Sequence, residues 1–523
     1  MKSLMKRVFA AAAAIATVFG LAATTVATAN AADNATLTVS TADAKFAGKT
    51  VNAYKMFSAT VSGDGKAVSY TLTDEWKPFF EKSVGLTGVT SENVNDKAND
   101  YVSNLQGDAL VAFATKASNW AQTTANNIAA GATATVSADA SSGNYTATFA
   151  GLDYGYYVVA VPGATLANTS GQYATLVSVD RANVTADIKG ALPTVVKKVN
   201  GGNATDAKIG DTLTFTLTST IPDMSAYDTY TFNFKDTLSQ GLTFGQVTSV
   251  TVDGATNPLT VNTDYTVTTP TGSDNTLTVA MKDFKAKQQA NAGKTITVTY
   301  TATLNEKAAV GGHGNTNSAT IQYSNNPSSS GTGESEPSKV RVFTYGFTVD
   351  KYTGKKYDDA ATRLAGAEFT LAHKDGSAIS FVKVADSETQ NAVYRVAKAG
   401  ETGDIISTPA NGKVVFQGLK NGEYTLTETK APAGYNKLAS AIGVKVNGQN
   451  DGTDTTNATV TITYNNNGSS NYNQSASNGV IPVQNKSGVT LPETGGMGTI
   501  AFTVIGVLVI ALGVAWTLKR KNA

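Results

Sequence analysis

Histidine and cysteine, the side chains that most often carry nucleophilic catalysis or bind metals, are almost absent from this chain. It contains two histidines, His313 and His373, and no cysteine. The chain therefore has almost none of the residues needed for Ser–His or Cys–His catalytic arrangements or for His/Cys metal sites. The loop NGQNDGTDTTN is faintly calcium-like in composition but lacks the terminal Glu of an EF-hand loop. We assign no metal and no cofactor, and a surface hydrolase built on a carboxylate pair remains an alternative.

The C-terminal stretch LPETGGMGTIAFTVIGVLVIALGVAWTLKRKNA has three parts. The first is a pentapeptide of Leu491, Pro492, Glu493, Thr494 and Gly495. Pro492 keeps the preceding residue out of helical conformations, so the pentapeptide offers extended backbone. The apolar run 499–518 is long enough to span a bilayer as a helix. The basic residues that follow, Lys519, Arg520 and Lys521, predict that the tail stays cytoplasmic.

The N-terminal residues 1–31 have the pattern of a secretory signal peptide. A basic start is followed by an apolar stretch that ends in Ala29-Asn30-Ala31, which predicts cleavage between Ala31 and Ala32. The chain between the two terminal segments is therefore expected outside the cell, where most proteins use disulfides that this one cannot form. A net charge of +1 offers no electrostatic surface for nucleic acid.

Many short runs of alternating apolar and polar residues indicate a mostly β protein of tandem immunoglobulin-like sandwiches. We expect an N-terminal domain over 32–190, with a helical insert at VNDKANDYVSNLQGDALVAFATKASNWAQ. A middle domain is expected over 191–327, and the Ser/Gly/Glu/Pro-rich residues 328–339 are predicted to form a linker. A third domain over 340–487 precedes the C-terminal region 488–523.

Several motifs carry a resemblance to known families. Residues 364–369 (LAGAEF) and 424–435 (YTLTETKAPAGY) resemble the collagen-adhesin B-type domain. The stretches IGDTLTFTLTSTIP, FKDTLSQGLTF and NTNSATIQYSN resemble the second domain of fimbrial backbone subunits. LPETG with its apolar run and basic tail resembles the cell-wall sorting signal of Gram-positive surface proteins. Together they are similar to the SpaA/FimA-type major pilins of sortase-assembled pili.

The resemblance implies a structural pilus subunit rather than an enzyme that turns over substrate. It implies that a sortase cleaves between Thr494 and Gly495 and passes the threonine carboxyl to an amine. The implied partners are identical subunits, ancillary pilins, pilus-specific and housekeeping sortases, and peptidoglycan, with host glycans or matrix proteins as adhesion targets. The implied location is the cell wall, after transient membrane retention through the C-terminal helix. A monomeric wall-anchored adhesin or a tip or base pilin is the alternative.

Domains of these types form an internal amide between a lysine and an asparagine side chain, assisted by an acid. The resemblance assigns these roles to Lys197, Asn317 and Asp236 in the middle domain, and to Lys351, Asn485 and Glu428 in the third. All six residues lie on the apolar register of their strands. Burial favours the neutral forms of a lysine and of a carboxyl, so the amine can attack the asparagine carbonyl carbon while the acid moves protons and ammonia leaves. The first domain shows no such set, so no bond is expected there.

A backbone pilin also needs an accessible lysine that joins subunits. The resemblance assigns this role to Lys189 in NVTADIKGALPTVVKK, four residues before Pro193 and on the polar register of its strand. The surrounding residues depart from the family pattern, because Asp187-Ile188 replaces Tyr-Pro and Gly190 replaces Asn. Lys198 is the alternative polymerisation lysine. The third interpretation is that Lys189 is an ordinary surface lysine.

Overall fold

The structure is a computed structural model that describes residues 34–521 except 64, 66, 167–171, 189, 226, 272–273, 326–330, 356–358, 386–390, 450–458, 467–470 and 489–496. It is mostly β, as the sequence predicts, with the strands arranged in sandwiches. The chain divides into two compact units. One comprises Met1–Tyr345, Gly418–Asn421 and Gly448–Val460, and the other comprises Gly346–Gln417, Gly422–Asn447 and Thr461–Ala523.

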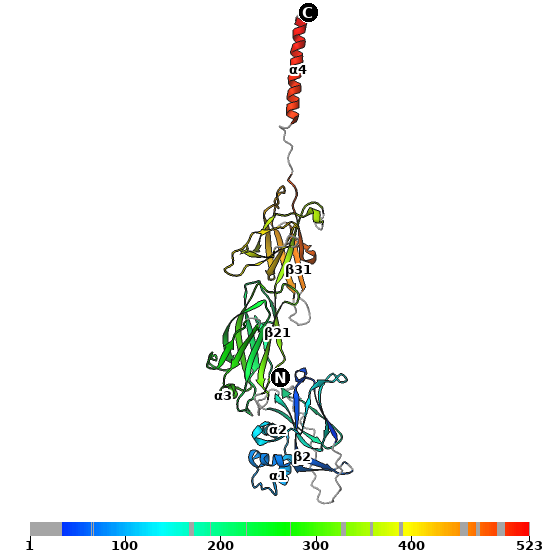
Figure 1. The fold of residues 1–523 in the computed structure, drawn as a ribbon, viewed down its shortest axis with the longest axis vertical. Helices are drawn as coiled ribbons and strands as arrows, with labels where there is room; N and C mark the ends of the chain where they lie inside the picture. The colour runs from blue at the N-terminus through cyan, green and yellow to red at the C-terminus, as the bar shows by residue number, and fades with distance from the viewer. Residues whose placement is uncertain are drawn as a thin grey trace. The chain divides into compact units, whose positions relative to one another are not determined.

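The first sandwich contains two sheets and the predicted helical insert. Its sheets have the strand orders β5-β6-β1-β9 and β10-β7-β2-β3, with β4 paired to β2 and β8 paired to β7. The strands are β1 (Ala35–Thr41), β2 (Thr50–Val61), β3 (Val68–Leu72), β4 (Ala132–Thr135), β5 (Ser137–Ala138), β6 (Tyr145–Leu152), β7 (Gly155–Leu166), β8 (Gln172–Val179), β9 (Asn183–Asp187) and β10 (Gly190–Ala191). Helices α1 (Val94–Ser103) and α2 (Gly107–Gln122) accompany these sheets (Figure 1). An apolar cluster that includes Phe57, Trp76, Phe80 and Phe113 packs the helices against the second sheet.

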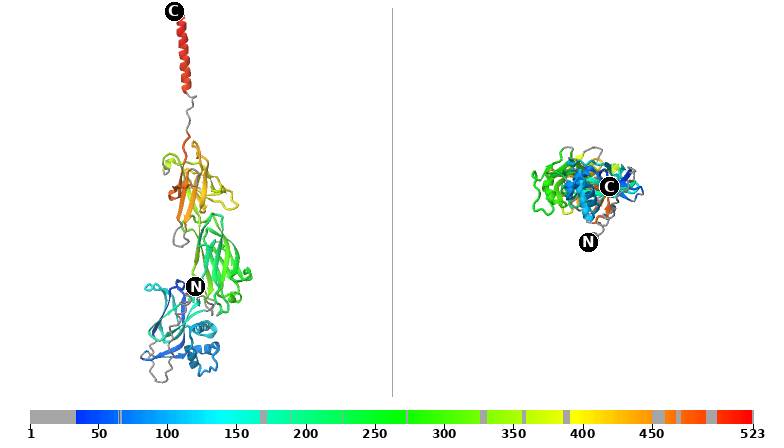
Figure 2. Two further views of the ribbon diagram at one scale, coloured as in Figure 1. Left: turned by 180° about the vertical axis from the view of Figure 1, so that it is seen from behind. Right: turned by 90° about the horizontal axis from the view of Figure 1, so that it is seen from below.

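The middle sandwich follows from strongly alternating strands. One sheet has the order β11-β13-β18-β15, and the other has the order β12-β21-β19-β14-β17-β16, with β20 paired to β19. These elements are β11 (Val196–Val199), β12 (Ala204–Asp206), β13 (Thr212–Thr220), β14 (Phe232–Leu238), β15 (Leu242–Val252), β16 (Tyr265–Thr268), β17 (Thr276–Met281), helix α3 (Phe284–Gln288), β18 (Thr295–Leu304), β19 (Asn315–Ser324), β20 (Thr332–Glu334) and β21 (Ser338–Phe343). Every second residue of β18 is buried, which places one face of that strand in the core. Figure 2 shows these strands, in green, from behind.

The segment expected to be a linker, 328–339, differs from the expectation. β20 pairs antiparallel with the end of β19, and β21 pairs antiparallel with its beginning. Val340 and Val342, which are predicted from the sequence to lie in the third domain, are buried on β21 in a sheet of the middle sandwich. The polar composition of the segment indicates a linker, whereas an edge strand such as β20 is stabilised by backbone pairing and needs little apolar surface.

The third sandwich contains the sheets β25-β26-β28-β22-β33 and β24-β23-β29-β30-β31-β32, with β27 paired to β23. Its strands are β22 (Tyr345–Tyr352), β23 (Glu368–His373), β24 (Ala378–Ile379), β25 (Phe381–Ala385), β26 (Ala392–Val396), β27 (Ile406–Ser407), β28 (Lys413–Leu419), β29 (Gly422–Lys430), β30 (Ile442–Gln449), β31 (Thr459–Asn465), β32 (Gln474–Ser475) and β33 (Val480–Gln484). The first and last strands, β22 and β33, are parallel neighbours. This pairing places the first and last strands of the domain side by side.

A C-terminal helix, α4 (Met497–Lys521), covers the apolar run 499–518. Among the described residues, no helix is long and apolar enough to cross a membrane. The predicted signal peptide with Ala31 and Ala32, the pentapeptide 491–495, and Lys189 lie outside the described residues.

Candidate functional sites

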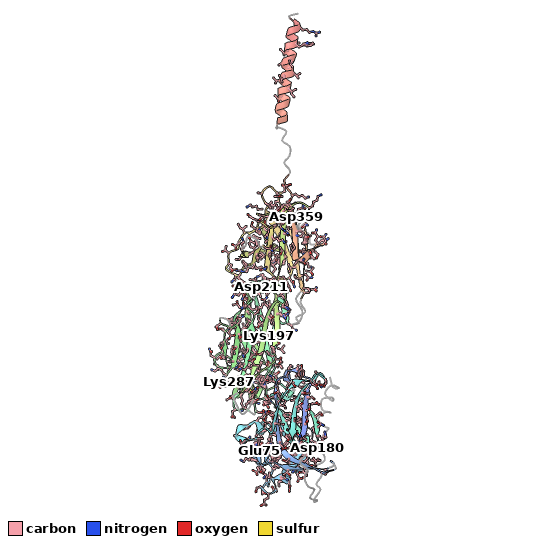
Figure 3. All side chains as sticks on the ribbon, turned by 45° about the vertical axis from the view of Figure 1, so that its right-hand side comes forward. Glu75, Asp180, Lys197, Asp211, Lys287 and Asp359 are labelled. Atoms are coloured by element: carbon pink, nitrogen blue, oxygen red, sulfur yellow. The ribbon has the colours of Figure 1, made fainter. Side chains whose placement is uncertain are left out.

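The first candidate site lies inside the middle sandwich, between its two sheets. Lys197 comes from β11 in one sheet, and Asp236 and Asn317 come from β14 and β19, which are neighbours in the other. In their antiparallel register, Asp236 is opposite Ala319 and Asn317 is opposite Leu238, so the two polar side chains are diagonal neighbours on one face. Figure 3 marks Lys197 in this sandwich. The three residues that the sequence assigns to the middle domain therefore meet in its core.

The polar atoms of this site form a connected network. The Lys197 ammonium forms an ion pair with Oδ2 of Asp236. It also donates to the hydroxyl of Tyr300, at 2.9 Å, and that hydroxyl donates to Asp236 Oδ2 at 2.7 Å. Nδ2 of Asn317 donates to the same hydroxyl at 2.6 Å. The amine and the amide are thus held at one hydroxyl oxygen, and the carboxylate contacts both that oxygen and the amine.

Burial pushes this lysine and carboxyl toward their neutral forms. Lys197 is 1% exposed and Asp236 is 0% exposed. Loss of water lowers the pKa of Lys197, although the charge of Asp236 acts in the opposite direction. The same loss of water raises the pKa of Asp236, against the opposing influence of Lys197. One proton transfer inside the pair converts two costly charges into an amine and a carboxylic acid.

The second candidate site lies inside the third sandwich and is built differently. Lys351 of β22 is opposite Val483 of the parallel strand β33, and Asn485 lies two residues beyond Val483, directly after the end of that strand. The backbone N–H of Asn485 donates to the carbonyl of Tyr352 at 3.0 Å, which continues the pairing. Glu428 comes from β29 in the facing sheet. Here the amine and the amide are neighbours in one sheet, and the acid reaches them from the other.

Glu428 contacts both reacting groups directly. Its Oε1 lies 3.1 Å from the Lys351 ammonium, and its Oε2 accepts from Nδ2 of Asn485 at 3.0 Å. All three residues are at most 1% exposed. Burial lowers the pKa of Lys351 to about 8, although Glu428 opposes the shift. At pH 7 about one such amine in ten is neutral, compared with fewer than about one in a thousand for an ordinary lysine.

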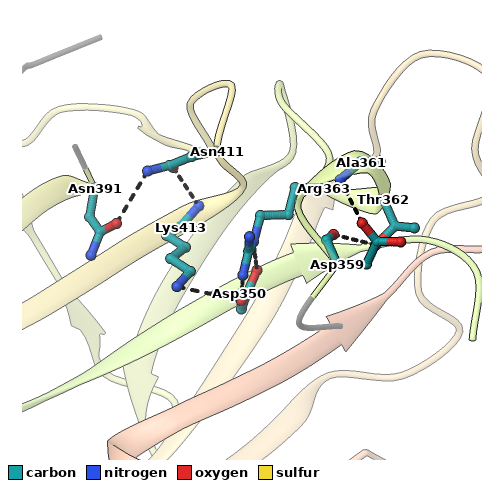
Figure 4. Close-up of polar contacts among 8 residues, drawn as sticks. All are labelled: Asp350, Asp359, Ala361, Thr362, Arg363, Asn391, Asn411 and Lys413. Carbon is teal, nitrogen blue, oxygen red and sulfur yellow. Dashed lines mark hydrogen bonds and ion pairs between the residues drawn. The ribbon is translucent and has the colours of Figure 1, made fainter. Parts of the chain in front are cut away.

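A second ion pair supports the strand that carries Lys351. The guanidinium of Arg363 donates twice to the buried carboxylate of Asp350, with both distances 2.9 Å (Figure 4). The backbone N–H of Lys351 donates to Gly412, and its carbonyl accepts from Leu364. These contacts fix the end of β22, so the lysine that follows Asp350 is held in position.

Lys198, the alternative polymerisation lysine, is partly exposed, and its ammonium donates to Asn203 Oδ1 at 2.6 Å. No group of three or more His, Cys, Asp or Glu residues that could hold a metal ion is found in the described part of the chain. Sequence reasoning missed Tyr300. Its place on the buried face of TITVTYTATL was a usable signal, because a buried tyrosine hydroxyl usually finds a polar partner.

Family models match three stretches of the chain. Residues 209–327 match the Gram-positive pilin backbone subunit 2, Cna-B-like domain. Residues 350–462 match the SpaA prealbumin-like fold domain, and residues 483–523 match the LPXTG cell wall anchor motif. The chain belongs to the Gram-positive pilins. The anchor motif marks this pilin as a secreted protein that is attached to the cell wall.

A relative of the pilin among known proteins has low sequence identity to it. The trypsin-resistant surface T6 protein of Streptococcus pyogenes serotype M6 is 26% identical over 281 residues, which cover 48% of the pilin and 45% of the T6 protein. The pilin therefore spans about half the length of the curated relative that it matches.

Two solved structures cover more of the pilin. The T6 backbone pilin of serotype M6 Streptococcus pyogenes has a TM-score of 0.46 at 19% identity and covers 87% of the pilin and 99% of that chain. The full-length major pilin SpaD of Corynebacterium diphtheriae has a TM-score of 0.41 at 18% identity, with coverages of 87% and 98%.

Proposed function

We propose that this pilin is the backbone subunit of a covalently polymerised pilus and that it locks two of its own domains with internal amide bonds. The bonds join Lys197 to Asn317 and Lys351 to Asn485, with Asp236 and Glu428 as the respective acids. The observation that carries the proposal is that each sandwich core buries a lysine, an acid and an asparagine within hydrogen-bonding reach of one another or of a shared group.

The proposed reaction needs no external enzyme. The lysine gives a proton to the acid, its neutral nitrogen attacks the asparagine Cγ, and the carbonyl electrons move to Oδ1. The acid then supplies a proton to Nδ2, the C–N bond breaks, the carbonyl re-forms and ammonia leaves. The new amide nitrogen finally gives its extra proton to the carboxylate, so the acid ends in its neutral form. In both sites Nδ2 faces the acid or its hydroxyl partner, the orientation that protonates the leaving nitrogen. The folded core supplies the proximity that makes the amide reactive.

The bonds would carry mechanical load. In the third domain the bond joins the first and last strands, so tension along the chain passes through a covalent link and not through the hydrogen bonds of the sandwich. In the middle domain the bond joins the two sheets through β11 and β19. An amide is insensitive to redox conditions, which fits an extracellular shaft that contains no cysteine.

Polymerisation uses a different lysine in this proposal. A sortase cleaves between Thr494 and Gly495, and Lys189 of the next subunit takes up the threonine carboxyl. The last subunit passes its threonine carboxyl to an amine of peptidoglycan. The match of residues 209–327 to a pilin backbone model favours this role over that of a monomeric adhesin.

A Glu428→Gln substitution tests the internal chemistry directly. The glutamine amide keeps the shape of the Glu428 side chain but cannot take up and return a proton. Asn485 should therefore retain its amide nitrogen, and no ammonia should be lost from the third domain. We expect the secreted chain from Ala32 to Thr494 to lie about 17 Da closer to its calculated mass than the unsubstituted protein does.

The matched control is Glu423→Gln on the same strand, since Glu423 is partly exposed and pairs with Lys374. This control should lose ammonia as fully as the unsubstituted protein. An unchanged ammonia loss in Glu428→Gln would remove Glu428 from the proposed reaction.

A further inference from the structure

We propose that the Tyr300 hydroxyl is a catalytic group of the middle-domain site, which relays a proton between Asp236 and the leaving nitrogen of Asn317. This inference rests on the proposed Lys197–Asn317 bond and assigns a fourth member to that site. It is carried by a hydroxyl that contacts the amine, the acid and the amide at the same time.

The position of Tyr300 is fixed by its surroundings. It lies on the buried face of β18, in the same sheet as Lys197, and is 0% exposed. Its ring stacks on Phe215 with centroids 5.2 Å apart and planes 10° from parallel. A ring packed in this way has no freedom to turn its hydroxyl elsewhere. The oxygen accepts from Lys197 and Asn317 and donates to Asp236, so it is also fully used as a hydrogen-bonding group.

The two sites differ in how the acid reaches the amide. In the third domain, Oε2 of Glu428 accepts directly from Asn485. In the middle domain, the described hydrogen bonds of Asp236 go to Lys197 and Tyr300, and the amide of Asn317 reaches the acid only through the hydroxyl. Aspartate is one methylene shorter than glutamate, and the tyrosine oxygen spans the remaining distance. The shorter acid and the added hydroxyl together do what Glu428 does alone.

The relay conserves every proton that it moves. Lys197 first transfers a proton to Asp236, and its neutral Nζ forms a bond to Cγ of Asn317 while the carbonyl electrons move to Oδ1. Tyr300 then gives its proton to Nδ2 and regains one from Asp236. The Cγ–Nδ2 bond breaks, the carbonyl re-forms, and neutral ammonia leaves. Finally the new amide nitrogen gives its extra proton to the Asp236 carboxylate, so the reaction ends with an amide, ammonia, a neutral Asp236 and an unchanged Tyr300.

The surroundings keep Tyr300 able to donate. Burial and the nearby Asp236 charge raise its pKa well above the ordinary value, so the hydroxyl holds its proton until one is exchanged for another. A relay group must return to its starting state, and a hydroxyl between an acid and a leaving amine does so without leaving a charge in the core.

Tyr300→Phe tests the relay, because it removes one oxygen and leaves the ring. The chain from Ala32 to Thr494 is made in a short cell-free pulse, and its intact mass is followed over time. We expect the first loss of ammonia, from the third domain, at the unsubstituted rate and the second roughly a hundredfold more slowly. Adding Asp236→Glu to Tyr300→Phe is expected to restore part of the rate, since the longer acid can reach Asn317 directly.

Tyr323→Phe is the control, since Tyr323 is a buried tyrosine of the same sandwich that makes none of these contacts. It should lose both ammonia molecules at the unsubstituted rate. Two losses at the unsubstituted rate in Tyr300→Phe would overturn the relay and leave the cross-links standing. No loss in the unsubstituted protein would instead overturn the proposed bonds themselves.

Discussion

Replacing Asp236 with Asn is expected to lower the thermal unfolding midpoint of the middle domain by roughly 15–25 °C. The proposed Lys197–Asn317 bond closes a loop of more than a hundred residues. By analogy with a disulfide, loss of such a closure costs about 5 kcal/mol of unfolding free energy. The substitution also leaves the buried Lys197 without its counter-charge, which adds to the loss. Differential scanning calorimetry of the secreted chain would resolve the shifted transition.

Two further variants separate bond loss from charge burial. Lys197→Met removes the amine but keeps an apolar chain of similar length, and the raised pKa of Asp236 lets that acid become neutral. Its midpoint should also fall by most of the same amount. As a control, Asp253→Asn, which changes an exposed acid directly after β15, should leave the midpoint unchanged. A Lys197→Met protein that unfolds at the unsubstituted temperature would mean that no covalent bond stabilises this domain.

Replacing Lys189 with Ala is expected to abolish the high-molecular-weight ladder on denaturing gels of cell-wall extracts. Without the nucleophile, the Thr494 acyl-enzyme has no subunit amine to attack it, so polymer chains cannot grow. Single subunits should still reach the wall, because the transfer of Thr494 to peptidoglycan does not involve Lys189. The measurement is an immunoblot of cells that express the pilin together with its sortases.

Lys198→Ala is the matched comparison for the ladder. Lys198 is the other candidate nucleophile, and its ammonium is hydrogen-bonded to Asn203. We expect a normal ladder in this variant. A ladder that persists in Lys189→Ala and disappears in Lys198→Ala would transfer the polymerisation role to Lys198, and one that persists in the double variant would contradict both assignments.

Alternation along the strands made much of the fold and the inward positions of the site residues predictable. Lys197 and Lys351 could be placed in the core because every second residue of a strand faces the same side. The helical insert was predictable from a long stretch without that alternation, and it forms α1 and α2.

Alternation does not predict which strands become neighbours in a sheet. The parallel pairing of β22 with β33 and the cross-sheet meeting of Lys197 with Asn317 depend on contacts between residues far apart in sequence. For the same reason, alternation predicts that Tyr300 is buried but does not predict that it contacts Lys197 and Asn317. The strand β20 was not predicted because its residues have the polar composition of a linker. Val340 and Val342 were predicted to lie in the third domain, but their strand, β21, belongs to a sheet of the middle sandwich.

The most direct measurement is the intact mass of the unsubstituted chain from Ala32 to Thr494. Two internal amides predict a mass about 34 Da below that calculated from the sequence, with the loss assigned by peptide sequencing to the Lys197–Asn317 and Lys351–Asn485 pairs. A mass equal to the calculated value, in a protein that is folded, would contradict the account.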